Sequence, residues 1–306
     1  MKEIKIFCPA TIANVSCGFD VLGLCLDNIG DEMIIRKVTE KGIRITKITG
    51  ADLPFEPEKN VAGVAALALI NAVNPDFGFE IEIHKKIKPG SGIGSSSASA
   101  AGAVFGINEL LGKPFTRKEL VQFAMKGEAL ASGSEHADNI APTLLGGFTL
   151  VRGYEPLDII RIESPSGLYT TVIHPQIELK TSEMRAVLKP MISLKSAITQ
   201  WGNLGGLIAG LYTEDYDLIS RSLEDVIVEP LRKGLIPSFD EVKKAAIENG
   251  ALGAGISGSG PSIFALSKGF TTAQKVAVAM NQTYLNTGIP FEIHISKIRK
   301  RFKENL

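Results

Sequence analysis

The sequence predicts an α+β protein made of two domains. Its 306 residues are enough for two domains of ordinary size with a sizeable core. In the first half strand-like segments precede helical ones, and in the second half the two kinds are mixed without a regular strand–helix–strand repeat. This order favours a two-layer α+β architecture over a doubly wound parallel sheet. A turn-rich stretch at residues 154–167 separates the halves, so we expect domains at residues 1–160 and 161–306.

The N-terminal half begins with strands and continues with helices. Asn60 is a plausible N-cap for a buried helix over residues 60–70, and a capping box, Thr116-Arg117-Lys118-Glu119, opens a helix over residues 116–131. Between them we expect a helix over residues 95–111, and after them a break in periodicity at residues 131–139. Apolar segments bounded by Gly or Asn turns predict strands at residues 4–7, 19–26, 33–38, 43–48, 79–84 and 148–152.

The C-terminal half mixes shorter strands with longer helices. The same patterns predict strands at residues 170–173, 262–266 and 291–295. They predict helices at residues 181–188, 193–211, 238–249 and 271–285. No internal repeat or low-complexity segment interrupts this order.

The composition excludes several classes of partner. The 33 basic and 33 acidic residues cancel, so no net field favours nucleic acid or an anionic membrane. Cys8, Cys17 and Cys25 are odd in number and lack metal-ligand spacing, which favours reduced thiols and a cytoplasmic protein. The first residues are too charged for a signal peptide, and Gly interrupts every apolar run before it reaches membrane-spanning length.

A glycine-rich loop gives the strongest indication of function. After the strand at residues 79–84 comes Lys88-Pro89-Gly90-Ser91-Gly92-Ile93-Gly94-Ser95-Ser96-Ser97, which runs into a helix. A loop between strand and helix places free N–H groups and a helix dipole together, and such a place binds phosphate. Ser95 stands where a Walker A loop needs Lys, so the loop is of another kind. The alternative is a tight turn followed by a serine N-cap.

A second glycine motif matches a nucleotide fingerprint in letters only. Residues 253–258 satisfy G-x-G-x-x-G, but a predicted helix precedes them and a predicted strand follows. The dinucleotide fingerprint requires the opposite order and an acidic residue about 20 positions further on, and none lies between Gly258 and Glu292. We therefore expect no nicotinamide or flavin, and a loop at residues 255–261 that approaches a ligand or another loop closely.

Three motifs together resemble a known kinase superfamily. Residues 9–20, 89–98 and 253–261 are similar to the three motifs of the GHMP kinases (galactokinase, homoserine kinase, mevalonate kinase and phosphomevalonate kinase), and the resemblance spans nearly the whole chain. Within the superfamily the chain resembles the homoserine kinase family, on residues 14–20, 132–139, 181–185 and 228–232. The resemblance implies an N-terminal nucleotide-binding domain, a ferredoxin-like C-terminal domain, and ATP-dependent phosphorylation of the side-chain hydroxyl of L-homoserine in threonine biosynthesis.

An amino-acid substrate needs groups for both of its charges. A carboxylate accepts from the ammonium, and guanidinium groups donate to the carboxylate. By this argument Asp20 with Asn14 would hold the amino end, and Arg185 with Arg232 the carboxylate. Arg185 is expected near the start of its helix, where the dipole disfavours a cation unless an anion binds there. Arg232 is expected in a Pro-bounded segment away from any clear helix, and each Arg taken alone would be a solvated surface charge.

The resemblance also assigns the nucleotide, the metal and the reacting groups. For magnesium it implies Ser96 and Glu128, and for the reaction Asn139, Asp138 and His136, with His136 and Asn139 beside the substrate hydroxyl. Asp138 could act as a base, or no base is used. Lys88 could contact phosphate or only cover apolar surface. Asn60 matches an adenine contact, and an N-cap explains it equally well. The residues implied for ATP are Asn60, Pro89, Gly90, Ser91, Gly92, Ile93, Gly94, Ser95, Ser96 and Ser97.

Two other functions stay open at this point. One is another small-molecule GHMP kinase, such as a mevalonate-type enzyme, whose substrate would not need Asp20 for an ammonium group. The other is a ligand sensor that kept the fold and lost phosphate transfer. The intact loop with Ser96, Glu128 and Asn139 argues against a sensor. We expect a homodimer that acts on small molecules and binds neither nucleic acid nor membrane.

Overall fold

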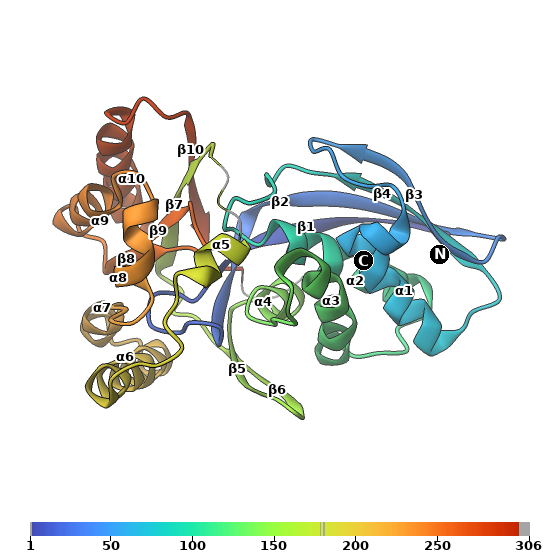
Figure 1. Ribbon diagram of the computed structural model, residues 1–306, viewed down its shortest axis with the longest axis horizontal. Helices are drawn as coiled ribbons and strands as arrows, with labels where there is room; N and C mark the ends of the chain where they lie inside the picture. Colours follow the sequence, from blue (N-terminus) through green and yellow to red (C-terminus); the bar gives the residue numbers. More distant parts are fainter. Residues whose placement is uncertain (1, 178, 180, 300–306) are drawn as a thin grey trace.

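The computed structural model describes residues 2–177, 179 and 181–299, which form two halves built on separate sheets (Figure 1). The first sheet has the order β3-β4-β2-β5-β6, with β1 paired to β2. All its pairs are antiparallel except β3 with β4. Its strands are β1 (Glu3–Ala13), β2 (Leu22–Val38), β3 (Gly42–Thr49), β4 (Gly78–His84), β5 (Phe148–Tyr154) and β6 (Leu157–Ile162).

Helices of the first half pack on this sheet and on one another. The helix α2 lies on β1 and β2, and α1 and α3 pack against α2. Small residues make this close packing possible, since 13 of the 16 residues of α2 are buried and most of them are Ala, Ser or Gly. The elements are η1 (Pro57–Lys59), α1 (Val61–Val73), α2 (Ser95–Leu110), α3 (Arg117–Ser132) and α4 (Ile140–Leu145).

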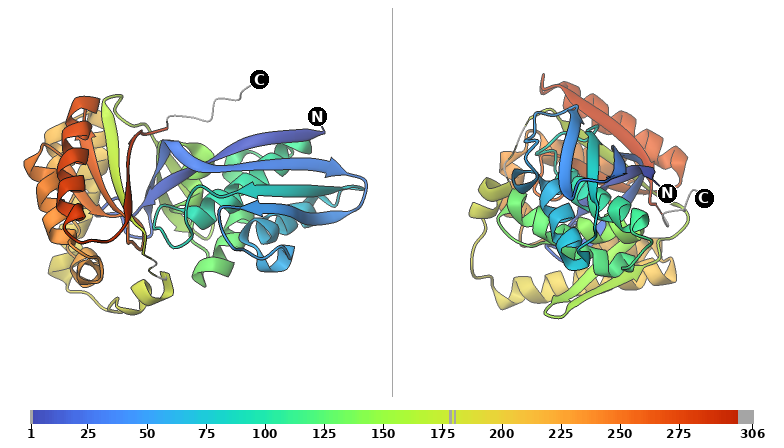
Figure 2. Two further views of the ribbon diagram at one scale, coloured as in Figure 1. Left: turned by 90° about the horizontal axis from the view of Figure 1, so that it is seen from above. Right: turned by 90° about the vertical axis from the view of Figure 1, so that its right-hand side faces the viewer.

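The second half contains a four-stranded antiparallel sheet of order β10-β7-β9-β8. In chain order this is 4-1-3-2, the ferredoxin-like arrangement. Helices α9 and α10 pack on the sheet, and α6 packs against α7 at the outer edge of this half (Figure 2). The elements are β7 (Leu168–Pro175), α5 (Thr181–Ala186), α6 (Leu194–Thr213), α7 (Tyr216–Ser222), α8 (Glu229–Arg232), η2 (Lys233–Leu235), α9 (Phe239–Glu248), β8 (Gly253–Ile256), β9 (Ile263–Lys268), α10 (Phe270–Leu285) and β10 (Phe291–Lys297).

The predicted fold class is confirmed, and several elements need correction. The strands expected at residues 19–26 and 33–38 are one strand, β2, and residues 19–21 lie in the turn before it. The reason is Gly30, which is part of a strand rather than of a turn. A side chain there would lie 2.5 Å from the carbonyl oxygen of Cys8 on β1, so Gly allows the two strands to pair closely.

Other corrections concern short elements that the sequence pattern did not reveal. The stretch expected as a domain boundary, residues 154–167, contains β6, and the connection between the sheets is residues 163–167. The loop expected at residues 255–261 starts later, because residues 255 and 256 belong to the buried strand β8 (Gly253–Ile256). The short helices α7 and α8 were not predicted, and the helix expected at residues 181–188 ends at Ala186.

One hydrophobic core extends through both halves. Leu207, Leu211 and Leu223 from the second half belong to the same buried cluster as the strands and helices of the first half. A second cluster lies between the four-stranded sheet and α9 and α10. The end of the described chain also returns to the first sheet, where the N–H of Arg299 donates to the carbonyl of Cys25 and its carbonyl accepts from Gly147. The two halves are therefore held together by core and backbone contacts.

Candidate functional site

A cavity of about 450 Å³ lies where the two halves meet. Its wall combines the glycine-rich loop, the turn after β1, the starts of α1 and α2, the loop after α3, and residues of α5 and α8. Two of the residues predicted for the site, Ile93 and Ser97, are buried and do not line the cavity. The others line it: Asn14, Asp20, Asn60, Pro89, Gly90, Ser91, Gly92, Gly94, Ser95, Ser96, Glu128, His136, Asp138, Asn139, Arg185 and Arg232.

The glycine-rich loop leads directly into the N-terminus of α2. Gly90, Gly92 and Gly94 all have positive φ, of 73°, 79° and 72°, a backbone conformation that favours glycine. The N-cap of α2 is Gly94, and no described side chain caps the first N–H groups. The serine N-cap considered from the sequence is therefore wrong, since Ser95 donates its hydroxyl to the carbonyl of Ile87 instead. Uncapped N–H groups at a helix start suit an anion such as phosphate.

Two serines in and just after the second glycine motif form hydrogen bonds to the glycine-rich loop. The hydroxyl of Ser257 donates to the carbonyl of Gly92 at 2.8 Å, and that of Ser262 donates to the carbonyl of Ser91 at 2.6 Å. Residues 253–256 form β8, and a tight turn then leads to β9 rather than to a helix. The absence of a following helix in this described segment agrees with the rejection of a dinucleotide fingerprint. The sequence left open whether this segment approaches a ligand or another loop, and the hydrogen bonds show that it contacts another loop.

The turn after β1 has an unusual backbone. Asn14, Val15 and Ser16 are three consecutive residues in the left-handed region, with φ of 70°, 43° and 61°. This conformation is rare for residues other than Gly and is unfavourable for the β-branched Val15. The turn is held by the side chain of Asn14, which accepts from the N–H of Asp20 at 3.1 Å and donates to the carbonyl of Gly258 at 2.8 Å.

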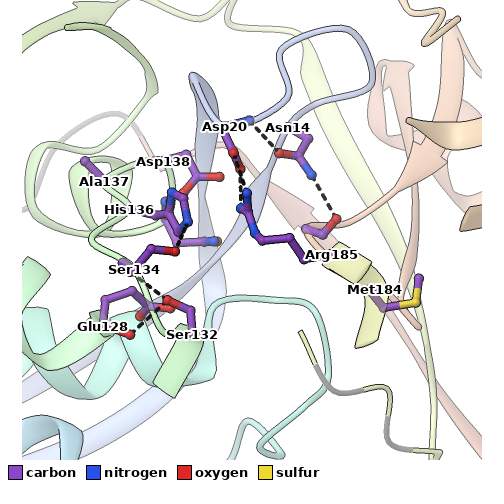
Figure 3. Close-up of polar contacts among 12 residues, drawn as sticks. Asn14, Asp20, Glu128, Ser132, Ser134, His136, Ala137, Asp138, Met184 and Arg185 are labelled. Carbon is purple, nitrogen blue, oxygen red and sulfur yellow. Dashed lines mark hydrogen bonds and ion pairs between the residues drawn. The ribbon is translucent and has the colours of Figure 1, made fainter. Parts of the chain in front are cut away.

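Asp20 and Arg185 form an ion pair across the cavity (Figure 3). Two guanidinium nitrogens of Arg185 donate to the two carboxylate oxygens of Asp20, at 2.9 and 3.0 Å. The third, Nε, is buried and has no hydrogen-bond partner among the described residues. The expected dipole conflict at Arg185 is wrong. The helix α5 has only six residues and Arg185 lies in its last turn, where a cation is favourable.

Arg232 is a buried cation beside this pair. Its side chain donates to the carbonyls of Met184 at 2.9 Å and Gly258 at 3.3 Å. Burial, and then the nearby charge of Arg185, lower its pKa to about 10. The expectation that it lies away from any helix is wrong, because it ends the short helix α8, and a residue only 2% exposed is not a solvated surface charge. The ring of Phe19 is close to both guanidinium groups, with its centroid 5.5 Å from the Cζ of Arg185 and 5.2 Å from that of Arg232.

The residues expected to hold magnesium lie next to each other. The hydroxyl of Ser96 lies 3.2 and 2.9 Å from the two carboxylate oxygens of Glu128, and Ser97 donates to one of them at 2.8 Å. Burial raises the pKa of Glu128, and no described cation pairs with it. In the described chain no three His, Cys, Asp or Glu side chains gather into a metal site. An ion held by Ser96 and Glu128 would therefore need further oxygen ligands, as Mg²⁺ obtains from phosphates and water.

The loop after α3 supplies three polar groups on the remaining wall. Asn139 accepts from the hydroxyl of Thr11 at 2.7 Å, and His136 lies 2.8 Å from the hydroxyl of Ser134. Burial, and then the charges of Asp20 and Glu128, raise the pKa of Asp138 to about 7. Burial also lowers the pKa of His136, so its neutral form is favoured at neutral pH.

The structure also places Asn60 and Lys88, for each of which the sequence left two roles open. Asn60 does cap α1, accepting from the N–H of Ala62 at 3.0 Å, and it also lines the cavity. Lys88 lies outside the cavity wall, 3.5 Å from the side chain of Gln176.

A buried ion pair beneath the glycine-rich loop was missed. Lys85 pairs with Asp31 on β2 and donates to the carbonyl of Ser95 at 2.9 Å. Asp31 in turn accepts from the N–H groups of Lys86 and Ile87. The pair thus connects β2, the end of β4 and the first turn of α2. The possible signal in the sequence was the register, since Lys85 continues the alternation of Phe79, Ile81 and Ile83 on the apolar face of the strand.

Known proteins similar to the chain share its full length. The profile described as GHMP kinases N terminal domain matches residues 60–147, and that described as GHMP kinases C terminal matches residues 207–286. The homoserine kinase of Chlorobium phaeobacteroides (strain BS1) is 48% identical, over 98% of each chain. The solved homoserine kinase of Cytophaga hutchinsonii is 50% identical with a TM-score of 0.95, covering 98% of this chain and 96% of the other.

More distant structures share the fold alone. The mevalonate kinase of L. major, solved with R-mevalonate, is 14% identical with a TM-score of 0.73, and 96% of each chain is covered. Within the described residues, every helix is too short or too polar to cross a bilayer.

Proposed function

The chain belongs to the homoserine kinase family of the GHMP kinases, and from this premise we propose how its residues carry out the phosphorylation of L-homoserine by ATP. One observation carries the proposal. A single cavity combines an uncapped helix N-terminus that suits phosphate with an arrangement of Asp20, Arg185 and Arg232 that suits a zwitterion. The reaction would transfer the γ-phosphate to the side-chain hydroxyl and give O-phospho-L-homoserine and ADP.

The substrate would take over the charges that Asp20 and Arg185 share in this structure. Its ammonium would pair with Asp20 near Asn14, and its carboxylate would pair with Arg185 and Arg232. The buried Nε of Arg185, which has no described partner, supports this placement, because a carboxylate would supply the missing acceptor. Bidentate pairs of guanidinium and carboxylate are among the stronger hydrogen bonds in proteins.

The nucleotide would lie along the other side of the cavity. Its phosphates would contact the glycine-rich loop and the start of α2, and its base would lie near Leu53, Pro54 and Asn60, which line one part of the wall. We propose that Ser96 and Glu128 hold Mg²⁺ there. The ion would bridge phosphate oxygens and stabilise the charge that develops during transfer.

The loop after α3 would position the reacting hydroxyl. Transfer of a phosphoryl group to an alcohol depends mostly on positioning and on charge stabilisation. Asn139, which lies close to Gly94, would orient the hydroxyl toward the γ-phosphate, with His136 beside it. Asp138, with a pKa of about 7, could accept the hydroxyl proton near neutral pH.

An assay of ADP release tests the substrate assignment. Release would be measured with ATP and magnesium in the presence of homoserine, threonine, mevalonate or shikimate. We expect homoserine to support the fastest turnover, because it alone presents both charges and a primary hydroxyl at the required separation. A mevalonate-type kinase would prefer mevalonate, and a sensor would release no ADP with any of the four.

Two expectations about the whole protein are proposed with this function. The first is a cytoplasmic location, supported by three buried cysteines that form no disulfide. Burial raises the pKa of Cys17 and of Cys25 to about 12, so both are kept as inert thiols. The second is a homodimer.

A further inference from the structure

The outer face of α6 carries an exposed apolar stripe. Lys195 is the only charged residue among the 20 residues of this helix. The stripe consists of residues spaced alternately four and three positions apart, namely Leu194, Ile198, Trp201, Gly205, Ile208 and Tyr212. Leu194, Ile198, Trp201 and Tyr212 are 69%, 57%, 63% and 58% exposed, and Ile208 is partly buried. A repeat of 3.5 residues is the pattern of a helix that packs lengthwise on another helix.

Apart from Ile208, which packs against the core, the large residues of the stripe are exposed rather than packed within the chain. The opposite face of α6 is the one that is buried, through Ala197, Leu207 and Leu211. On that face Gln200 donates to the carbonyl of Cys17 and to Asp225, at 3.0 Å each. Contiguous exposed apolar residues that include the chain's only Trp are typical of an interface rather than of a free surface.

We propose that α6 forms a two-fold interface with the α6 of a second copy of this chain, with the two helices antiparallel. The order of spacings, 4-3-4-3-4, reads the same in both directions, so antiparallel pairing places every stripe position opposite another. Around a two-fold axis at residue 203, Trp201 lies opposite the partner's Gly205, Ile198 opposite the partner's Ile208, and Leu194 opposite the partner's Tyr212. A two-fold interface must be self-complementary in this way.

Size and charge both fit this arrangement. A side chain at Gly205 would meet nothing within 4 Å in its own chain, so there is open space above Gly205 for the indole of a partner. Lys195 lies near the start of the helix and Glu214 just after its end, and neither forms an ion pair with another described residue. In an antiparallel pair each Lys195 lies near the partner's Glu214, whereas a parallel pair would bring like charges together.

This inference gives the proposed homodimer its interface, and it rests on no part of the kinase assignment. A dimer without activity would contradict only the function proposed above, and an active monomer would contradict only the interface. A pair of single helices buries less than the roughly 800 Å² per partner of a standard interface, so we expect a dimer that dissociates on dilution.

The test uses the full chain and its single Trp. Sedimentation velocity and tryptophan fluorescence would be measured between about 0.1 and 100 µM, a range that covers moderate affinities. We expect the mass of two chains at the high end, and a red shift of the emission on dilution as Trp201 becomes solvated. Gly205→Glu should abolish both changes. The variant keeps the Trp, its added Cβ has no atom within 4 Å in its own chain, and Glu improves helix propensity over Gly, so loss of the dimer would not reflect unfolding.

Two further variants make the result specific. Thr199→Glu places the same charge on an exposed position of α6 outside the stripe and should leave the dimer intact. Lys195→Glu and Glu214→Lys should each weaken the dimer, and the double variant should restore it if the helices are antiparallel. A chain that is monomeric throughout the range, or a dimer that survives Gly205→Glu, would overturn the proposal. So would a monomer that binds phosphatidylcholine vesicles through the stripe, since the occupant would then be lipid.

Discussion

Asp20 and Arg185 form an ion pair with each other in this structure. An amino-acid substrate would have to break this pair, so that its ammonium binds Asp20 and its carboxylate binds Arg185. Both side chains are about one-third exposed, which leaves them accessible from the cavity. Arg232 differs because it is buried and holds two backbone carbonyls in place. Removal of Arg185 should therefore affect the substrate alone, whereas removal of Arg232 should also reduce stability.

Arg185→Ala should raise the KM for homoserine about ten- to hundredfold, because a charge-assisted contact contributes about 1.5–3 kcal/mol. The KM for ATP and the melting temperature should stay close to wild type. Arg221→Ala removes an exposed Arg of α7 and serves as the matched control. A loss of ATP binding in Arg185→Ala would place the clamp on the nucleotide and contradict the amino-acid site.

Glu128→Gln should shift the magnesium dependence of activity to concentrations at least about tenfold higher, since a neutral amide is a poorer ligand for this hard cation. The KM for homoserine should change much less. The control is Glu163→Gln, an exposed carboxylate that pairs with Arg161. A magnesium titration that coincides with that of wild type would exclude Glu128 as a ligand.

Asp138→Asn should change how stability depends on pH. Burial raises the pKa of Asp138 from its usual value of 3.8 to about 7, so the folded state binds the proton more tightly than the unfolded chain does. Its contribution to stability is present below the unfolded pKa and is lost as the pH rises through 7, at about 1.4 kcal/mol per pH unit. Relative to the Asn variant, wild type should therefore lose stability between pH 5.5 and pH 7, as urea denaturation would measure. Parallel curves for the wild type and the Asn variant would refute the raised pKa.

The motifs of the sequence predicted 16 residues that line the cavity, because each motif is local, but not others in its wall such as Leu53, Pro54 and Lys85. They could not show which residues pair. Asp20 and Arg185 are 165 positions apart, and only the fold brings their side chains together. The Lys85–Asp31 pair was missed because a Lys just after a strand is usually solvent-exposed and Asp31 is 54 positions away, although Lys85 continues the register of Phe79, Ile81 and Ile83.

At the scale of elements, the structure depends on two loops that touch. The glycine-rich loop and the turn after β8 share the hydrogen bonds of Ser257 and Ser262. At Gly92 an added Cβ would lie 2.5 Å from the carbonyl oxygen of Gly260 and 2.7 Å from that of Ser257. A side chain at Gly92 would thus first push the two loops apart, and the phosphate site would be distorted as a consequence.

Gly92→Val should therefore weaken ATP binding strongly, as calorimetric titration would measure. Gly112→Val is the matched control, since Gly112 has a similar φ of +87° but open space around the added Cβ. Both variants bear the strain of a left-handed β-branched residue, and only Gly92→Val disturbs the loops. Equal ATP affinity in the two variants, with intact circular dichroism, would show that the contact between the loops does not matter for nucleotide binding.

Elements with strong patterns were predictable, and those dictated by tertiary contacts were not. The order strand, glycine loop and helix around residue 90 was correct because every local preference agrees there. The strand β8 has the sequence Gly-Ala-Gly-Ile, which no strand propensity would select. Its glycines are required by neighbours, since a side chain at Gly253 would lie 2.5 Å from Leu223 and one at Gly255 would lie 2.7 Å from Ser16.

At the scale of the whole molecule, the two halves share one main core, and we expect them to unfold together. Calorimetry should give a single transition whose calorimetric and van 't Hoff enthalpies agree. We expect joint unfolding because one buried cluster joins α6 and α7 to the first half, and because Arg299 forms backbone hydrogen bonds with Cys25 and Gly147. Two resolved transitions would show that the halves are independent folding units despite these contacts. The α+β class and the ferredoxin-like order were predictable, whereas this shared core was not, because its members are distant in sequence.

The ion pair of Asp20 and Arg185 also bears on selectivity. A zwitterion carries the same two charges as this ion pair. Its binding would replace one ion pair by two, between Asp20 and its ammonium and between Arg185 and its carboxylate, and the net charge of the cavity would not change. A molecule with only a carboxylate would open the pair and leave Asp20 without a cation, and one with only an amine would leave Arg185 without an anion. Each orphaned charge is costly in a partly desolvated cavity. With the site proposed above, the Asp20–Arg185 pair would therefore select against a singly charged alcohol before any contact with its hydroxyl is made.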